Sequence, residues 1–166
     1  MPKVLISDKL SPRAVTLFRE RCVDVDVKSD LSPDELLSII GNYDGLAIRS
    51  ATRVTEELLE AAANLKVVGR AGIGTDNIDL RAATKRGVIV MNTPHGNSVT
   101  TAEHTITMML ALSRQIPAAN TSTKAGKWEK SRFMGTEITG KTLGLIGCGN
   151  IGCVVAERAQ GLKMRV

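Results

Sequence analysis

The sequence predicts an α/β fold with a parallel sheet, and three observations carry this prediction. Five short β-forming runs alternate with helical patterns between residues 3 and 94, an order typical of parallel strands joined by crossover helices. A further strand–turn–helix pattern follows later, where Gly147, Gly149 and Gly152 form a G-x-G-x-x-G turn after an apolar run. With 166 residues, of which 43% are apolar and 23% charged, the chain is globular and can bury a sizeable core.

Local signals set the expected elements of the first part of the chain. The expected strands are 3–7, 23–27, 45–50, 66–72 and 88–94, and the expected helices are 11–21, 32–42, 54–65 and 77–87. Ser11 and Ser32 each precede a proline and are expected to be helix N-caps, as is Thr55. The alternating run Val23–Val27 indicates a strand near a sheet edge. We expect helices to cover both faces of this sheet.

After residue 97 the pattern changes, and we place a domain boundary near residues 97–100. The expected elements are a helix over 98–115, a second helix over 118–126, a strand over 140–147, a helix over 150–162 and the opening of a strand at 163–166. Thr100 and Glu103 have the spacing of a capping box. The first helix is apolar almost all round from Ile106 to Leu112, which predicts a helix buried on both sides.

Composition argues against several classes of protein. The formal charge is +5, but the basic residues are scattered and only one Trp, one Tyr and two Phe are available to stack on bases, so we expect no nucleic-acid partner. No apolar stretch is long enough to cross a bilayer, and no Cys/His spacing indicates a metal site. Asp8 and Lys9 interrupt any signal sequence. Cys22, Cys148 and Cys153 are expected to be reduced core thiols of a cytoplasmic protein.

The glycine turn has the context that a dinucleotide-binding motif requires. Gly147 would allow a tight turn, Gly149 the close approach of a pyrophosphate to the backbone, and Gly152 the packing of helix on strand. A plain structural turn is the alternative. The acidic residue that contacts the adenine ribose is expected roughly 20 residues further on. Because the chain reaches only Val166, we expect it to be the front half of a larger protein, and the residues leave NAD or NADP open.

Four segments carry a resemblance to a known family. They are "GRAGIGTDNID", "VMNTPHGNSVTTAEHTI", "KWEKSRFMGTEITGKTLGLIGCGNIG" and "GLKMRV". Together they resemble the D-isomer-specific 2-hydroxyacid dehydrogenases over essentially the whole chain, most closely the bacterial branch that acts on D-3-phosphoglycerate. The resemblance implies a flavodoxin-like substrate-binding lobe, here residues 1–98, followed by the start of a Rossmann NAD-binding lobe, residues 99–166, which is truncated.

For the substrate, the residues and the resemblance indicate two loops. Arg49 and Ser50 follow a strand, where open α/β sheets bind ligands, and the resemblance implies that they contact phosphoglycerate. A solvated arginine is the alternative. Gly72 and Gly74 would let backbone amides approach a carboxylate, with Ile73 also near the nicotinamide of the cofactor. A structural turn is the alternative for this loop.

The remaining candidates are assigned mainly by the resemblance. The cofactor turn would comprise Gly147, Gly149, Asn150, Ile151 and Gly152. Asn97 would point into the active-site cleft, or it is a helix N-cap.

Neither His95 nor His104 matches the catalytic histidine of the family, whose histidine, glutamate and arginine are expected beyond Val166. We therefore expect no catalytic residue in this chain. Trp128 is either a packing residue or part of a dimer interface.

The resemblance implies that the complete protein oxidises D-3-phosphoglycerate to 3-phosphohydroxypyruvate with NAD, which opens serine biosynthesis. These 166 residues alone are expected to give no turnover. The expected partners are a small anionic substrate and further copies of the chain, joined through the NAD-binding lobe, with no membrane. The alternatives are another D-2-hydroxyacid dehydrogenase, a non-catalytic NAD-binding relative, and a subunit that only dimerises.

Overall fold

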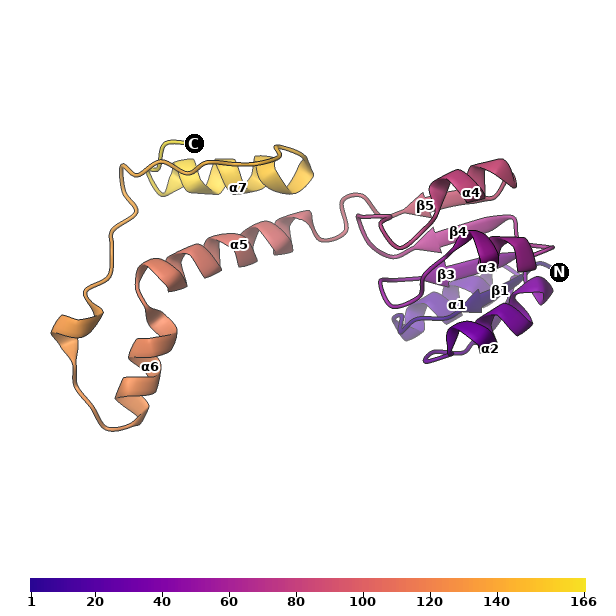
Figure 1. Cartoon of the computed structure of the whole chain (residues 1–166), viewed down its shortest axis with the longest axis horizontal. Coiled ribbons are helices and arrows are strands. Elements are labelled where there is room, and N and C mark those ends of the chain that lie inside the picture. Colours follow the sequence, from indigo (N-terminus) through magenta and orange to yellow (C-terminus); the bar gives the residue numbers. More distant parts are fainter. The chain divides into compact units, whose positions relative to one another are not determined.

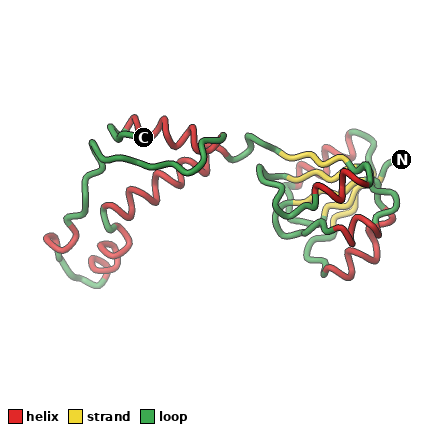
Figure 2. Tube along the Cα trace, turned by 45° about the horizontal axis from the view of Figure 1, so that its top comes forward, coloured by secondary structure: helices red, strands yellow, loops and turns green.

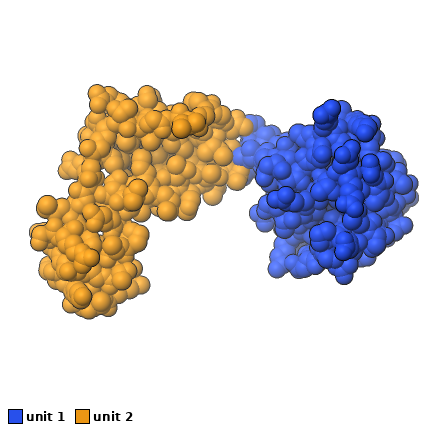
Figure 3. Space-filling view, in the orientation of Figure 1, with its two compact units in different colours: residues 1–96 blue, residues 97–166 orange.

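The computed structural model describes residues 1–166 and divides into two compact units. Unit 1 comprises Met1–Gly96 and unit 2 comprises Asn97–Val166 (Figure 3). None of the helices combines the length and the apolar character that a membrane span requires. The two units are described separately below.

Unit 1 is built on a five-stranded sheet whose neighbouring strands all run parallel (Figures 1 and 2). The strands are β1 (Lys3–Ile6), β2 (Asp24–Val27), β3 (Gly45–Ile48), β4 (Val67–Arg70) and β5 (Ile89–Asn92), in the spatial order β2-β1-β3-β4-β5. The predicted α/β fold and parallel sheet are confirmed. β2 lies at the sheet edge, as its alternating pattern predicts.

Three of the four α-helices of unit 1 start at the predicted caps. The helices are α1 (Pro12–Glu20), α2 (Pro33–Ile39), α3 (Glu56–Ala61) and α4 (Leu80–Lys85), with a 3-10 turn η1 (Ile40–Asn42) after α2. Ser32 and Glu35 form a complete capping box, and the Ser11 and Thr55 side chains also accept N-terminal amides. Asp79 caps α4 through the amide of Ala82, at 2.8 Å, a cap that we did not predict.

The core of unit 1 lies on one face of the sheet. There α2, α3 and α4 pack side by side, while α1 lies behind the sheet in Figure 1. The largest fully buried side chains are Leu5, Ile6, Ile40, Leu46, Ile48, Leu59, Val54 and Val68. Our expectation that helices cover both faces is wrong at β5, where Ile89 is 62% and Met91 56% exposed, because α1 packs against β2, at the opposite edge of the sheet.

Unit 2 consists of two long helices that pack against each other and a smaller helical extension. Its elements are α5 (Ser98–Ser113), α6 (Ile116–Lys124), the 3-10 turn η2 (Lys130–Phe133) and α7 (Asn150–Gly161). α5 and α7 lie side by side (Figure 1), with Ala102, Val155 and Ala159 buried and a 3.7 Å ion pair between Glu103 and Arg158.

Three predictions for the helices of unit 2 are wrong. α5 is not buried on all sides, since Met108 is 56% and Leu112 81% exposed; α7 covers only part of it. Thr100 and Glu103 form no capping box, because the helix already begins at Ser98 and Thr100 lies inside it. α6 begins at Ile116 rather than at residue 118, with a proline in its first turn, and ends at Lys124.

The expected strand over residues 140–147 and the strand opening at 163–166 are also wrong as strands. They meet only in an isolated bridge between Thr142 and Arg165. A strand needs at least one neighbour that pairs with it over several residues, and here one short segment supplies a single bridge. Ile146 is accordingly fully exposed.

Candidate functional site

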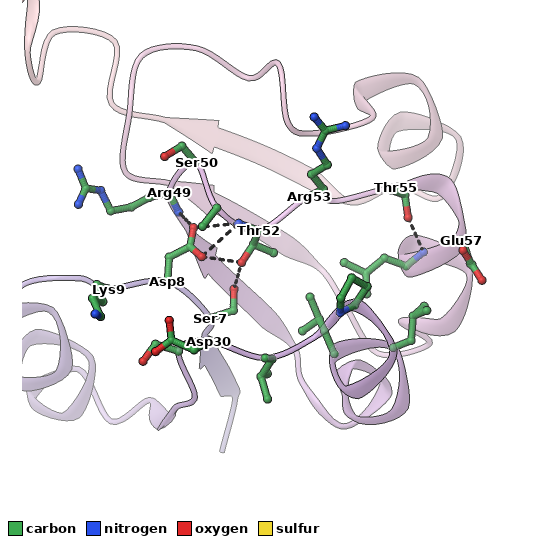
Figure 4. A pocket seen from close by; sticks show the side chains of 17 residues that line it. Ser7, Asp8, Lys9, Asp30, Arg49, Ser50, Thr52, Arg53, Thr55 and Glu57 are labelled. Atoms are coloured by element: carbon green, nitrogen blue, oxygen red, sulfur yellow. Dashed lines mark hydrogen bonds between the residues drawn. The ribbon is translucent and has the colours of Figure 1, made fainter.

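A cavity of about 590 Å³ lies where the carboxyl ends of β1 and β3 diverge (Figure 4). In the order β2-β1-β3-β4-β5, the connection after β1 runs toward β2 and the connection after β3 runs in the opposite direction, toward β4. Open α/β sheets bind ligands at such a switch point. The cavity is lined by residues that follow β1, β2 and β3, including Ser7–Lys9, Ser29–Leu31 and Arg49–Arg53.

One wall of the cavity is the segment Arg49–Thr52, which we name the strap. Asp8, 6% exposed, holds it from below: its carboxylate accepts the amide of Arg49 at 2.6 Å and the hydroxyl of Thr52 at 2.7 Å. The amide of Thr52 points to the same carboxylate at 3.2 Å, and Ser7 shares a 2.8 Å hydrogen bond with the Thr52 hydroxyl. These charge-assisted bonds compensate the buried negative charge.

Two side chains hold the strap from its other side. The amide group of Asn77 donates to the carbonyl oxygens of Arg49 at 2.8 Å and of Thr52 at 2.6 Å. Arg70, at the end of β4, donates from Nε to the same Arg49 carbonyl at 3.2 Å. The backbone of the strap is therefore fixed while the Arg49 side chain stays exposed.

The charged side chains around the cavity do not neutralise each other in pairs. Lys9, Arg49 and Arg53 contribute positive charge, and none of them forms an ion pair within the chain. The side chains of Arg49, in the strap, and Arg53, directly after it, extend in different directions (Figure 4). A guanidinium that is free of carboxylates can bind a phosphate or carboxylate through two parallel hydrogen bonds.

The predicted glycine loop over Gly72–Gly74 lies beside the strap, and Arg70 joins the two. Its guanidinium donates to the Gly74 carbonyl and forms a 3.5 Å ion pair with Asp76. Asn92 donates to the Ile73 carbonyl at 2.7 Å, and the Thr93 amide donates to the Gly72 carbonyl at 3.0 Å. The structure thus brings the two predicted substrate loops together.

The glycines of this loop have a packing role as well. A Cβ at Gly74 would lie 2.8 Å from Oδ1 of Asp76, and a Cβ at Gly72 would lie 3.1 Å from Nη1 of Arg70. Neither glycine has a positive φ. A larger residue at either position would therefore displace the end of the Arg70 or Asp76 side chain, without straining the backbone.

Asp8, Arg70, Asn77 and Asn92 were missed by the sequence analysis. Asp8 and Arg70 do follow or end buried strands, which is the one signal that could have singled them out.

In unit 2, the turn from Gly147 to Gly152 leads directly into α7. Gly147 has a φ of +97°, which favours glycine, and a Cβ at Gly152 would collide with the carbonyl oxygen of Gly147. At Gly149, the N-cap of α7, no atom lies within 4 Å of the position that a Cβ would take, and no side chain caps the helix. The turn before α7 is thus exposed, and its glycines leave space beside the helix N-terminus, which fits a dinucleotide pyrophosphate.

The other predicted residues fall around these features. Asn150 and Ile151 form the first turn of α7. Asn97 occupies the N-cap position of α5, but its side chain makes no capping hydrogen bond. His95 is exposed in the loop before α5, and His104 is exposed on α5.

Comparison with known proteins agrees with this architecture. The model of the "D-isomer specific 2-hydroxyacid dehydrogenase, catalytic domain" matches residues 4–160. The chain is 48% identical to D-3-phosphoglycerate dehydrogenase of Archaeoglobus fulgidus over 164 residues, which cover 99% of this chain and 31% of that protein. The chain thus spans about a third of the length of this curated relative.

Two solved structures resemble the whole chain. The TT0316 protein of Thermus thermophilus superposes with a TM-score of 0.90 at 34% identity, over 99% of this chain and 54% of that one. The NAD+-bound 3-phosphoglycerate dehydrogenase of Entamoeba histolytica gives a TM-score of 0.78 at 31% identity, over 99% and 52% of the two chains. The chain belongs to the D-isomer specific 2-hydroxyacid dehydrogenase family, as its four segments predict.

Proposed function

We propose that this chain belongs to an NAD-dependent dehydrogenase that oxidises D-3-phosphoglycerate to 3-phosphohydroxypyruvate, the opening step of serine biosynthesis. The observation that carries the proposal is the exposed Arg49 guanidinium, held without a carboxylate partner on a fixed strap at a switch-point cavity. The name of the Archaeoglobus relative supports phosphoglycerate as the substrate.

In this proposal, residues 1–98 form the N-terminal segment of the substrate-binding lobe. Arg49 binds an anionic group of the substrate and the Ser50 hydroxyl donates to it. The backbone amides of Gly72–Gly74 bind the substrate carboxylate. Ile73 contacts both substrate and nicotinamide, and Asn97 faces the substrate. Asp8, Asn77 and Arg70 position the strap. They bond to its backbone and leave the Arg49 guanidinium available for the anionic group of the substrate.

Residues 99–166 form the beginning of the NAD-binding lobe. Gly147, Gly149 and Gly152 shape the turn, and the amides at Asn150 and Ile151 face the pyrophosphate. When bound, NAD supplies the hydride acceptor. The exposed glycine turn before α7, with space beside Gly149, supports this role, as does the NAD+ bound by the Entamoeba relative. We assign no catalytic proton donor to this chain, so we expect these 166 residues to bind ligands without turnover.

Calorimetric titration with D-3-phosphoglycerate tests the substrate half of the proposal. Arg49→Met is expected to weaken binding at least about tenfold, since a charge-assisted bidentate contact is lost. Arg53→Met, on the same cavity wall, is the matched control and should change affinity less than about threefold. Equal losses in both variants would contradict a specific role for Arg49. Tighter binding of D-lactate than of phosphoglycerate would favour another D-2-hydroxyacid substrate.

Titration with NADH tests the cofactor half. Gly152→Ala places a Cβ against the Gly147 carbonyl, so the turn must shift and NADH binding should fall at least about tenfold. Gly161→Ala, at the end of α7 where no atom lies within 4 Å of the new Cβ, should bind NADH as the parent chain does. Reduction of NAD by the chain with phosphoglycerate would contradict the assignment of no catalytic residue.

We also propose that the protein acts in the cytoplasm as a homo-oligomer joined through the NAD-binding lobe. The support is the exposed apolar surface of unit 2: Trp128 is 84% exposed, Leu112 81% and Met134 75%. Light scattering is expected to give a dimer or larger species, and Trp128→Ala should shift it toward monomer. A monomeric parent chain would overturn this part of the proposal.

A further inference from the structure

Two cysteines lie in and next to the glycine turn of unit 2, and their side chains are in contact. Cys148 lies between Gly147 and Gly149, and Cys153 lies in the first turn of α7. Their sulfur atoms are 3.6 Å apart, and both residues are exposed. This arrangement corrects our expectation of buried core thiols. Cys22, the third cysteine, is also exposed and belongs to unit 1.

The backbone around the pair holds the two sulfurs close. The amide of Cys153 donates to the Gly149 carbonyl at 2.9 Å, which fixes Cys153 on the helix, and its thiol lies 3.3 Å from the Cys148 carbonyl oxygen. Gly147 and Gly149 flank Cys148, so its backbone has more freedom to adjust than an ordinary segment has. A disulfide requires a sulfur separation of about 2.05 Å. Closing the remaining gap requires a rotation of side chains and a small shift of this turn.

The two thiols are not equivalent. The hydrogen bond with Cys148 raises the pKa of the Cys153 thiol, so Cys153 keeps its proton to higher pH. Cys148 precedes α7, on the segment between two glycines. Because the neighbouring thiol of Cys153 keeps its proton to higher pH, we assign the attack on an oxidant to Cys148 and the resolution of the product to Cys153.

We propose that Cys148 and Cys153 are an oxidisable dithiol that closes into a disulfide across the glycine turn, with a peroxide as the oxidant. In the first step, the Cys148 thiol attacks hydrogen peroxide, the O–O bond breaks, and a sulfenic acid and one water form. In the second step, the Cys153 sulfur displaces the hydroxyl of the sulfenic acid, the S–S bond forms and a second water leaves. Two electrons pass from the two sulfurs to the peroxide.

The disulfide has a consequence for cofactor binding, and this part rests on the proposed function. The turn that the bridge would tighten is the one whose amides face the pyrophosphate, and such turns tolerate little displacement because backbone and phosphate must approach closely. Oxidation is therefore expected to weaken NADH binding at least about tenfold. Reduction of the disulfide should restore the affinity.

Peptide mapping tests the disulfide itself. Trypsin cuts after Lys141 and Arg158, so both cysteines fall in the single peptide Thr142–Arg158, and Cys22 falls in a separate peptide, 22–28. After treatment with hydrogen peroxide and alkylation, this peptide should lose two hydrogen atoms and carry no alkyl group. Cys153→Ser should abolish that product, and Cys22→Ser should leave it unchanged. A wild-type peptide that is alkylated at both cysteines after oxidation would overturn the proposal.

NADH titration after removal of the peroxide tests the consequence. The oxidised wild-type chain should bind at least about tenfold more weakly than the reduced chain, with recovery in dithiothreitol. The variant Cys148→Ser/Cys153→Ser should be insensitive to peroxide. Unchanged affinity in a chain that carries the disulfide would refute the effect on the turn. The disulfide could also form on oxidation in a chain that, when reduced, does not bind NADH. That result would contradict the dehydrogenase proposal and support the dithiol alone.

Discussion

Asp8 carries a negative charge in a place that water hardly reaches, and four hydrogen bonds from neighbouring groups hold it there. Its two oxygens accept the amides of Arg49 and Thr52 and the Thr52 hydroxyl. In Asp8→Asn, the new NH2 group would face these donors without an acceptor. Because unpaired buried donors are costly, we expect the free energy of unfolding to fall by about 1 to 3 kcal/mol.

Urea denaturation followed by circular dichroism measures this loss. Asp30→Asn is the control, since Asp30 lines the same cavity but is exposed, and it should change stability by less than about 0.5 kcal/mol. Similar losses in the two variants would mean that Asp8 does not hold the strap.

Two carboxylates, Asp26 within β2 and Asp44 just before β3, make unit 1 sensitive to acid. The side-chain hydrogen bond from Lys3, followed by that from Tyr43, lowers the pKa of Asp26. The backbone amide of Lys3, followed by the Lys66 ammonium, lowers the pKa of Asp44. A carboxyl with a lower pKa in the folded state stabilises that state above its unfolded pKa of about 3.9. This stability is lost as the pH falls through the lowered folded-state pKa.

Unfolding in urea at several pH values from 7 down to 2 checks this dependence. We expect the free energy of unfolding to fall below about pH 4, and Asp44→Asn to reduce both the stability at pH 7 and the slope in acid. Glu60→Gln, an exposed position on α3 without an ion pair, should keep the parent slope. An unchanged slope in Asp44→Asn would show that this carboxylate does not contribute.

Of two helix caps predicted from the local sequence, Ser32 and Thr100, only the one at the start of α2 is present in the structure. Ser32 and Glu35 satisfy each other's amides at the start of α2, so Ser32→Ala should cost about 1 kcal/mol in unfolding free energy. Thr100 lies inside α5, so Thr100→Ala should change stability by less than about 0.5 kcal/mol. Thermal unfolding of both variants measures the difference. A loss at Thr100 as large as at Ser32 would mean that Thr100 is the N-cap and that the helix begins three residues later than described.

The elements of unit 1 were predictable because their signals are local. A serine followed by proline starts α1 and α2, apolar runs mark β1, β3, β4 and β5, and an alternating run marks β2. In unit 2, by contrast, residues 140–147 have the composition of a strand without the neighbours that a strand needs, and only the bridge between Thr142 and Arg165 forms. Strand composition describes a suitable surface, and pairing decides whether a ladder forms.

The two units differ in how much apolar surface they bury. The hydrophobic cluster that contains Leu5, Leu46 and Val68 lies entirely in unit 1, whereas unit 2 buries only Ala102, Val155 and Ala159 among its apolar residues. We therefore expect the amides of β1, β3 and β4 to exchange with deuterium far more slowly than those of residues 127–149, by about a hundredfold or more. Hydrogen exchange with mass spectrometry measures this, and uniform protection along the chain would contradict it.

The candidate site residues could be proposed from the sequence, because Arg49, Ser50 and the glycines at 72, 74, 147, 149 and 152 belong to short motifs. The groups that hold those motifs were not visible. Asp8 meets the strap across 41 to 44 positions of sequence, and Asn77 meets it across 25 to 28. A polar residue after a strand can be seen in the chain, but its partners depend on which strands become neighbours.

The same contrast holds for the dithiol and for the faces of α5. The spacing of Cys148 and Cys153 was plain, but apolar neighbours suggested burial, and the fold leaves both thiols exposed and 3.6 Å apart. Composition and local pattern thus specified the α/β class, the sheet edge and the capped helices of unit 1. Burial, strand pairing and long-range hydrogen bonds had to come from the folded chain, because each depends on a second segment whose position no local pattern contains.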